Sequence, residues 1–173
     1  MPRVFLGLGS NRQRHDNLSA ALDALLLEFR DLALSPVFES APLAGEGAPY
    51  LNLVVAFETE LLLPQLNEHC KALETKLGRR REGEQTTEVP LDIDILTYGK
   101  LTGRSCGLQL PRPEIASAAH VLWPLAVLAP REKHPLLQRT YAELWQDFDR
   151  SGQSIRPVDF TWHERQISSA QNL

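Results

Sequence analysis

The chain has 173 residues, a length that fits one domain, or one domain with a tail. Its 43% hydrophobic and 23% charged residues are ordinary values for a globular protein with one core. A net charge of −4 argues mildly against a general nucleic-acid binder, which usually carries a basic excess, although a local arginine cluster can still hold a small anionic substrate.

The cysteines and the N-terminus favour a cytoplasmic protein. Cys70 and Cys106 have no metal-type spacing and no CxxC motif, so we expect free thiols in a reducing compartment. The apolar run in "MPRVFLGLGSN" is too short for a signal peptide. No window approaches the roughly 20 apolar residues of a membrane span, so we expect no membrane partner.

The chain begins with a strand and a helix. Residues 3–10 predict a short buried strand that ends in a glycine turn. Residues 15–29 predict an amphipathic helix with Asp16 as its N-cap. Its apolar face is expected to comprise Leu18, Ala21, Leu22, Leu25, Leu26 and Phe29.

Two strands follow. Residues 32–40 predict the second strand, in which Pro36 indicates an edge or an irregularity. Residues 41–49 are rich in glycine and proline and predict a loop, and residues 50–60 predict the third strand.

A second helix is predicted over residues 62–80, because Pro64 lies near its first turn and Gly78 near its end. Residues 82–88 have no apolar period and predict an exposed loop. The apolar stripe of this helix is expected to comprise Leu66, Cys70, Leu73 and Leu77.

The remaining elements are a fourth strand over residues 90–99, a possible short strand over residues 107–114, and a buried helix or extended segment over residues 117–130, interrupted at Pro124. Residues 150–173 are polar and weakly patterned, which predicts a poorly ordered or loosely docked tail.

The order strand, helix, strand, strand, helix, strand predicts an α+β fold. We expect a ferredoxin-like βαββαβ core, a mostly antiparallel sheet with helices packed on it, plus C-terminal additions. The domain is expected to span residues 1–149 and the polar tail residues 150–173. This fold hosts many functions, so it does not define one.

The fourth strand carries two carboxylates. Because side chains alternate along a strand, Asp92 and Asp94 should share one face, with Cα atoms about 6.5–7 Å apart, while Leu91, Ile93 and Ile95 point into the core. Close carboxylates repel unless a cation lies between them, and Mg²⁺ commonly binds one or two carboxylates together with substrate phosphates. The alternative is a solvated acidic face.

Three consecutive arginines, Arg79, Arg80 and Arg81, end the second helix. They could simply complement the helix dipole. Arginine side chains also match phosphate oxygens, so together with a metal-binding carboxylate pair they indicate phosphoryl-type chemistry on a nucleotide.

Several segments now resemble one family. The segments "FLGLGSN", "YLNLVVAFET", "LETKLGRRR", "PLDIDILTYG" and "LWPLAVLAP" occur in the order and near the spacing found in 6-hydroxymethyl-7,8-dihydropterin pyrophosphokinase, a folate-pathway enzyme. The resemblance covers roughly residues 3–132. The D-x-D strand after a Gly-Arg-x-Arg helix end is fairly specific in combination.

The resemblance implies transfer of the β,γ-diphosphoryl unit of ATP to the pterin hydroxymethyl group, with AMP as product. ATP is the co-substrate, and two Mg²⁺ ions would bridge its phosphates. Asp92 and Asp94 match the metal ligands. Arg79 and Arg81 match the arginines that contact ATP and assist catalysis.

The resemblance also implies a pterin site. Asn52 matches the asparagine whose amide reads the edge of the pterin ring, and Tyr50 matches an aromatic position just before it. Ser40 and Leu43 match positions that contact pterin through backbone groups. His120 lies where the family usually has a stacking phenylalanine.

The loop before the fourth strand and two later positions also depart from the family pattern. Thr86 replaces a loop tryptophan, Val89 replaces a loop arginine, and Ala118 replaces a triphosphate-binding arginine. Each lost charge-assisted hydrogen bond to phosphate is worth about 1.5–3 kcal/mol. Arg112 replaces the usual histidine and is a candidate nucleotide-binding residue. Arg112, Arg80 or Arg104 could compensate for the lost contacts.

The pyrophosphokinase is the leading hypothesis, with pterin and ATP as small-molecule partners and no nucleic acid. The altered loop favours an alternative, a divergent paralogue that binds a pterin or related heterocycle with weak or no diphosphotransferase activity. A nucleic-acid binder would need exposed sheet aromatics and a basic surface. A purely structural interaction module would leave the Asp92–Asp94 pair without a ligand.

Overall fold

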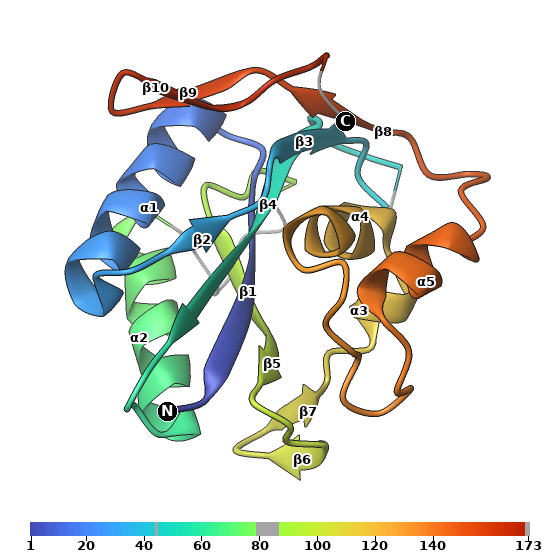
Figure 1. Ribbon diagram of the computed structural model, residues 1–173. Coiled ribbons are helices and arrows are strands. Elements are labelled where there is room, and N and C mark those ends of the chain that lie inside the picture. The colour runs from blue at the N-terminus through green and yellow to red at the C-terminus, as the bar shows by residue number, and fades with distance from the viewer. Residues whose placement is uncertain (44, 79–86, 172–173) are drawn as a thin grey trace.

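The computed structural model describes residues 1–43, 45–78 and 87–171 (Figure 1). A six-stranded antiparallel sheet has the strand order β5-β1-β4-β3-β8, and β2 also pairs with β4. Its strands are β1 (Arg3–Ser10), β2 (Ala33–Leu34), β3 (Val37–Ser40), β4 (Tyr50–Glu58), β5 (Asp92–Tyr98) and β8 (Ile155–Val158).

Helices cover both faces of this sheet (Figure 1). The helices are α1 (Arg14–Phe29), α2 (Leu63–Lys76), α3 (Glu114–Ser117), α4 (Ala119–Leu128) and α5 (Tyr141–Gln146). Two hairpins complete the fold: β6 (Gly103–Ser105) with β7 (Leu108–Leu110), and β9 (Phe160–Trp162) with β10 (Arg165–Ser168). The order from β1 to β5 and its antiparallel pairing confirm the ferredoxin-like α+β prediction.

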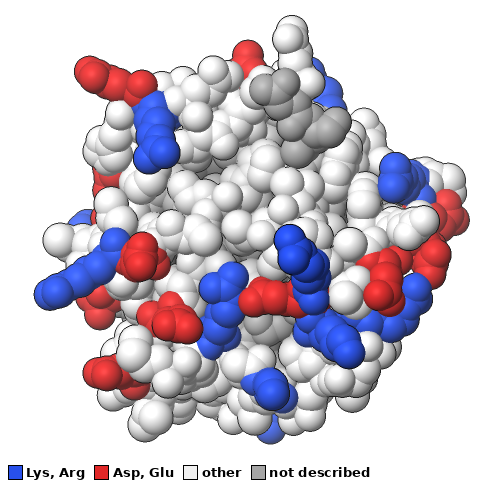
Figure 2. Space-filling model, in the orientation of Figure 1, with Lys and Arg blue, Asp and Glu red and all other residues white. Residues whose placement is uncertain are grey.

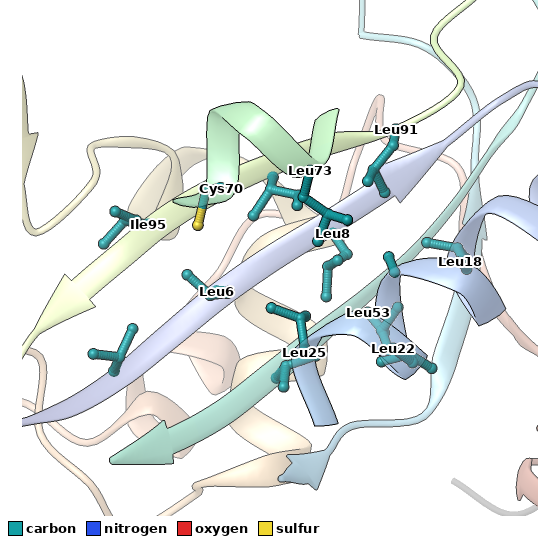
Figure 3. Close-up of a cluster of buried hydrophobic side chains, with 14 of the residues drawn as sticks. Leu6, Leu8, Leu18, Leu22, Leu25, Leu53, Cys70, Leu73, Leu91 and Ile95 are labelled. Carbon is teal, nitrogen blue, oxygen red and sulfur yellow. The ribbon is translucent and has the colours of Figure 1, made fainter. Parts of the chain in front are cut away.

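The first core lies between the sheet and helices α1 and α2 (Figure 3). Leucines from α1 and the stripe of α2 face β1, β4 and β5, as their three-and-four spacing predicts. Fully burying each leucine contributes about 1.5–3 kcal/mol, so this layer supplies much of the stability. Leu26 is the exception to the predicted face, because it is 38% exposed.

The second core lies on the opposite face of the sheet. Phe5, Val54 and Leu96 pack there against α3 and α4. The predicted interruption at Pro124 is wrong, since α4 runs unbroken from Ala119 to Leu128. Proline removes one helical hydrogen bond, but most of this helix is buried, and the burial offsets the loss.

Two local predictions need correction. Asp16 lies in the first turn of α1 rather than at the N-cap, which is Gln13 with a φ of 43°. The predicted strand over residues 32–40 is divided at Ser35 and Pro36, as proline there indicated. The Ser35 hydroxyl accepts a hydrogen bond from Val54 N at 2.8 Å, which replaces a regular ladder contact.

The predicted poor order of residues 150–173 is wrong for residues 155–168. Strand β8 pairs with β3, and Phe160 is only 2% exposed within the first core. The Ser168 hydroxyl accepts from Val37 N at 2.8 Å and contacts Val158 O at 2.6 Å. The strands are three or four residues long, too short to show an apolar period.

Cys70 is buried and Cys106 is exposed, and both are free thiols, as predicted. Across the described ranges, no helix has the length and apolar character needed to cross a membrane.

A carboxylate on β3 joins the C-terminal strand to α1. Glu39 accepts from Arg14 Nη1 at 2.7 Å and from Arg156 Nη2 at 2.9 Å. The hydrogen bond from Arg14, and then that from Arg156, hold the pKa of Glu39 below its ordinary value of 4.5. The resulting stabilisation is present above pH 4.5 and is lost as the pH falls through the lowered pKa of the folded state.

We therefore expect Glu39→Gln to lower the free energy of unfolding at pH 7 by about 0.5–1 kcal/mol, since water screens the exposed Arg156. Urea unfolding at pH 7 and pH 3 should show this difference shrinking at the lower pH. Glu28→Gln, an exposed change on α1, is the control. An equal loss at both pH values would show that the Glu39 charge is not involved.

Candidate functional site

Two glycines of β1, Gly7 and Gly9, form the floor of the site. In the antiparallel register, Gly9 lies between Asn52 on β4 and Asp92 on β5, and Gly7 lies opposite Asp94. These positions share the sheet face that packs against α4 farther along the strands. Because glycine has no side chain, this end of the face is not filled, and the polar groups on both sides line a cavity.

A cavity of about 450 Å³ stands on this floor, a size typical of small-molecule sites. The loop after β3 forms one wall, and α4 forms another. Seven residues of the predicted metal and pterin sites line it, although they come from four separate parts of the chain: Ser40, Leu43, Tyr50, Asn52, Asp92, Asp94 and His120.

The other singled-out positions are distributed differently. Val89 lines the cavity, whereas Ala118 is 1% exposed and belongs to the second core. Arg79, Arg80 and Arg81 and the altered loop position Thr86 lie outside the described residues.

The Asn52 side chain is held in one orientation. It is 5% exposed, and its Nδ2 donates to Ser40 Oγ at 2.7 Å. A Cβ at Gly9 would lie 3.1 Å from Asn52 Oδ1, so the amide lies close to the backbone of β1. An asparagine amide offers both a donor and an acceptor, which suits the edge of a heterocycle.

The carboxylates of β5 share one face, as predicted, while Leu91, Ile93 and Ile95 are buried in the first core. Burial, and then the charge of Asp92, raise the pKa of Asp94 above its ordinary value. The Arg112 guanidinium opposes this rise, because its Nη2 lies 2.9 Å from Asp94 Oδ1.

This pair fits a divalent cation. Two aspartates offer hard oxygen ligands and leave coordination positions for phosphate and water, the pattern typical of Mg²⁺. Behind them, the buried Glu74 accepts from Ile93 N at 2.9 Å and so fixes the backbone between the two carboxylates. No cluster of three or more possible metal-binding side chains occurs among the residues described.

His120 is on the cavity wall formed by α4. Burial lowers its pKa, although the charges of Asp92 and Glu114 act in the opposite direction. The ring is therefore neutral at neutral pH, which makes it a suitable surface for stacking on a flat heterocycle.

Sequence reasoning missed one connecting residue, Asn11. Its Nδ2 donates to Thr87 O at 2.6 Å, and its Oδ1 accepts from Val89 N at 2.6 Å. A longer contact of 3.4 Å reaches Ala48 O in the loop over the cavity. A polar residue directly after a buried strand was the available signal, but its partners are distant in sequence.

Comparisons with known proteins identify the family of the chain. The family model described as 7,8-dihydro-6-hydroxymethylpterin-pyrophosphokinase (HPPK) matches residues 5–130. A 2-amino-4-hydroxy-6-hydroxymethyldihydropteridine pyrophosphokinase of Pseudomonas aeruginosa is 37% identical over 140 residues, covering 77% of this chain and 84% of that protein. The enzyme of the same name from Porphyromonas gingivalis is 39% identical over 138 residues, covering 75% and 92%.

Solved structures show the same fold. The crystal structure of wild-type Plasmodium falciparum HPPK-DHPS matches 96% of this chain with a TM-score of 0.67 at 14% identity. This chain spans 50% of that longer protein. The match of the family model and the relatives above 30% identity show that the chain belongs to the 7,8-dihydro-6-hydroxymethylpterin-pyrophosphokinase family.

Proposed function

We infer that the protein transfers diphosphate from ATP to 6-hydroxymethyl-7,8-dihydropterin, giving AMP, as a step of folate biosynthesis. Family membership supports this activity. The observation that best supports it is the glycine floor on β1, Gly7 and Gly9, with the Asn52 amide on one side and the Asp92–Asp94 pair on the other. A heterocycle and a metal-bound triphosphate could therefore bind next to each other.

The pterin would occupy the Asn52 side of the cavity. The Asn52 amide, oriented by Ser40, would pair with the polar edge of the ring. The neutral His120 ring and Tyr50 offer apolar surfaces for the ring faces. Leu43 is 65% exposed on the loop over the cavity, where it could cover a bound ligand.

The triphosphate would occupy the Asp92–Asp94 side. These carboxylates would hold Mg²⁺, which when bound neutralises phosphate charge. Arg112, whose Nη2 lies 2.9 Å from Asp94 Oδ1, would contact the same phosphates. Arg79 and Arg81 are proposed to contact ATP on the basis of the sequence pattern alone.

The geometry suits an in-line displacement. The pterin hydroxyl oxygen would form a bond to the β-phosphorus as the bond from that phosphorus to the α,β-bridging oxygen breaks; the hydroxyl proton is released to solvent, and AMP leaves with the bridging oxygen. The side chains on the two sides of the floor bind and orient the reactants, and this positioning is the main protein contribution to phosphoryl-type transfer. The charged side chains stabilise the phosphate charge.

The face of the protein shown in Figure 2 does not favour nucleic-acid binding. On the face seen in Figure 2, basic and acidic side chains are interspersed rather than gathered into a basic stripe. Non-specific nucleic-acid binding depends on such a stripe, so small-molecule substrates remain the better match.

The test is AMP formation by the purified protein with ATP, Mg²⁺ and 6-hydroxymethyl-7,8-dihydropterin. We expect AMP to form only when the pterin is present. A reaction without pterin measures any background ATP hydrolysis. Pterin binding without pterin-dependent AMP would instead support the divergent paralogue.

The glycine floor gives a specific prediction. In Gly9→Ala the new Cβ would lie 3.1 Å from Asn52 Oδ1 and 3.6 Å from Tyr50 Cδ1, so the Asn52 amide must shift by a few tenths of an ångström. Since misplacing a substrate-positioning group by about 1 Å can cost up to roughly 100-fold, this smaller shift should raise the KM for pterin about 3- to 10-fold. Steady-state kinetics measures the change.

Gly107→Ala, in the turn between β6 and β7 and outside the cavity, is the matched control, because a Cβ there meets no atom within 4 Å. Its φ of 78° adds backbone strain, so Tm is compared for both variants. An unchanged KM for pterin in a folded Gly9→Ala protein would contradict the placement of the pterin over this strand.

A further inference from the structure

The C-terminal segment, here residues 152–158, reaches the wall of the cavity. After β8 pairs with β3, the hydrogen bonding continues one step further, because Ala41 N donates to Ser154 O at 3.2 Å. Ala41 begins the loop that carries Leu43 over the cavity. The start of this loop is therefore fixed by β4 on one side and by the C-terminal segment on the other.

The same segment also fixes the start of α4. The helical conformation is interrupted between α3 and α4 at Ala118, which is extended with φ −119° and ψ 118°. This break leaves the last carbonyl of α3 and the first N–H of α4 without helical partners. Alanines at 118 and 119 have no side-chain group that could cap the helix.

One side chain satisfies both groups. The Gln153 Oε1 accepts from Ala119 N at 2.8 Å, and its Nε2 donates to Ser117 O at 3.0 Å. The amide thus bridges the end of α3 and the start of α4 from 34 residues away in sequence. His120, the next residue along α4, lines the cavity.

A small space of about 60 Å³ lies between these parts, and five of its lining residues also line the substrate cavity. Ser40, Pro42 and Leu43 line it from the loop, His120 from α4, and Gln153 and Ile155 from the C-terminal segment. A shift of Gln153 would therefore change the position of His120 relative to the loop.

We propose that Gln153 is a positioning residue of the pterin pocket, which acts by fixing the start of α4 and hence the His120 ring. The proposal rests on the proposed function, because it takes a pterin as the ligand that contacts His120. It assigns a role in pterin binding to a segment outside residues 5–130, the region that matches the family.

The test replaces the Gln153 side chain with one of similar length that has no amide. In Gln153→Met both hydrogen bonds are lost, and we expect the KM and Kd for pterin to rise about 5- to 10-fold, while kcat and the KM for ATP stay within about twofold. Gln146→Met, at the exposed end of α5, is the matched control and should change none of these values.

A double-mutant cycle separates positioning from general stability. If Gln153 acts through His120, then Gln153→Met should have little further effect on the Kd for pterin in the His120→Ala background. Fully additive effects would overturn the proposal. If Gln153→Met does not fold, Gln153→Asn, which keeps the amide one methylene shorter, takes its place with the same expected direction.

The outcomes also distinguish this proposal from the proposed function. Fluorescence titration gives the Kd for pterin without turnover. Wild-type protein that binds pterin but forms no AMP would refute the proposed function alone, and the titration would still decide the role of Gln153. Wild-type protein that forms AMP, with an unchanged Kd and KM for pterin in Gln153→Met, would refute the role of Gln153 alone. Wild-type protein without pterin affinity would refute both.

Discussion

Asp94→Asn should lower pterin-dependent AMP formation by at least about 1,000-fold, equivalent to about 4 kcal/mol of transition-state stabilisation. The substitution keeps the size of the side chain but removes the negative charge that would bind Mg²⁺. It also removes the ion pair with Arg112, whose Nη2 lies 2.9 Å from Asp94 Oδ1. The loss should appear in kcat at saturating Mg²⁺ and ATP.

The pterin side of the cavity should survive this change. Asn52 is oriented by Ser40 on the opposite side of the floor, so the Kd for pterin measured without ATP should change less than about threefold. Asp31→Asn, at an exposed position outside the cavity, is the charge-matched control and should retain full activity. Substantial AMP formation by Asp94→Asn would contradict the assignment of the metal site to β5.

The site arises from a change of composition along one sheet face. Toward one end, Phe5, Val54 and Leu96 pack under α4 and close the second core. Two residues or more farther along the same strands, glycine, asparagine and aspartate replace the apolar side chains. The sheet stays intact because the first core packs on its other face, so this end can hold a cavity without losing its support.

Local patterns predicted the parts of the fold that depend on periodicity. The alternation in β5 correctly separated Asp92 and Asp94 from Ile93 and Ile95, and three-and-four spacing identified the buried stripes of α1 and α2. These patterns are visible because each element is at least seven residues long.

Contacts between distant short segments were not predictable in the same way. Asn11 joins residues 87–89 to the end of β1, and Gln153 joins the C-terminal segment to α4. Each is a single polar residue in a turn, where hydrogen bonds to backbone groups leave no repeating pattern. Ion pairing between Arg112 and Asp94 likewise depends on tertiary placement.

The C-terminal hairpin gives the largest expected effect on stability. Phe160→Ala should lower the free energy of unfolding by about 3–5 kcal/mol, a large share of the roughly 5–15 kcal/mol that stabilises a typical domain. The side chain is 2% exposed, and its ring stacks on His15 of α1 with centroids 4.4 Å apart. Urea unfolding at constant pH measures the loss.

The comparison with Leu27→Ala decides whether this hairpin belongs to the cooperative core. Leu27 lies on α1 but is 85% exposed, so its truncation should cost less than about 0.5 kcal/mol. If Phe160→Ala cost no more than this control, the hairpin would unfold separately from the sheet. A large loss with an unchanged m-value would instead mean that the segment expected to be a loose tail unfolds together with the domain that contains the site.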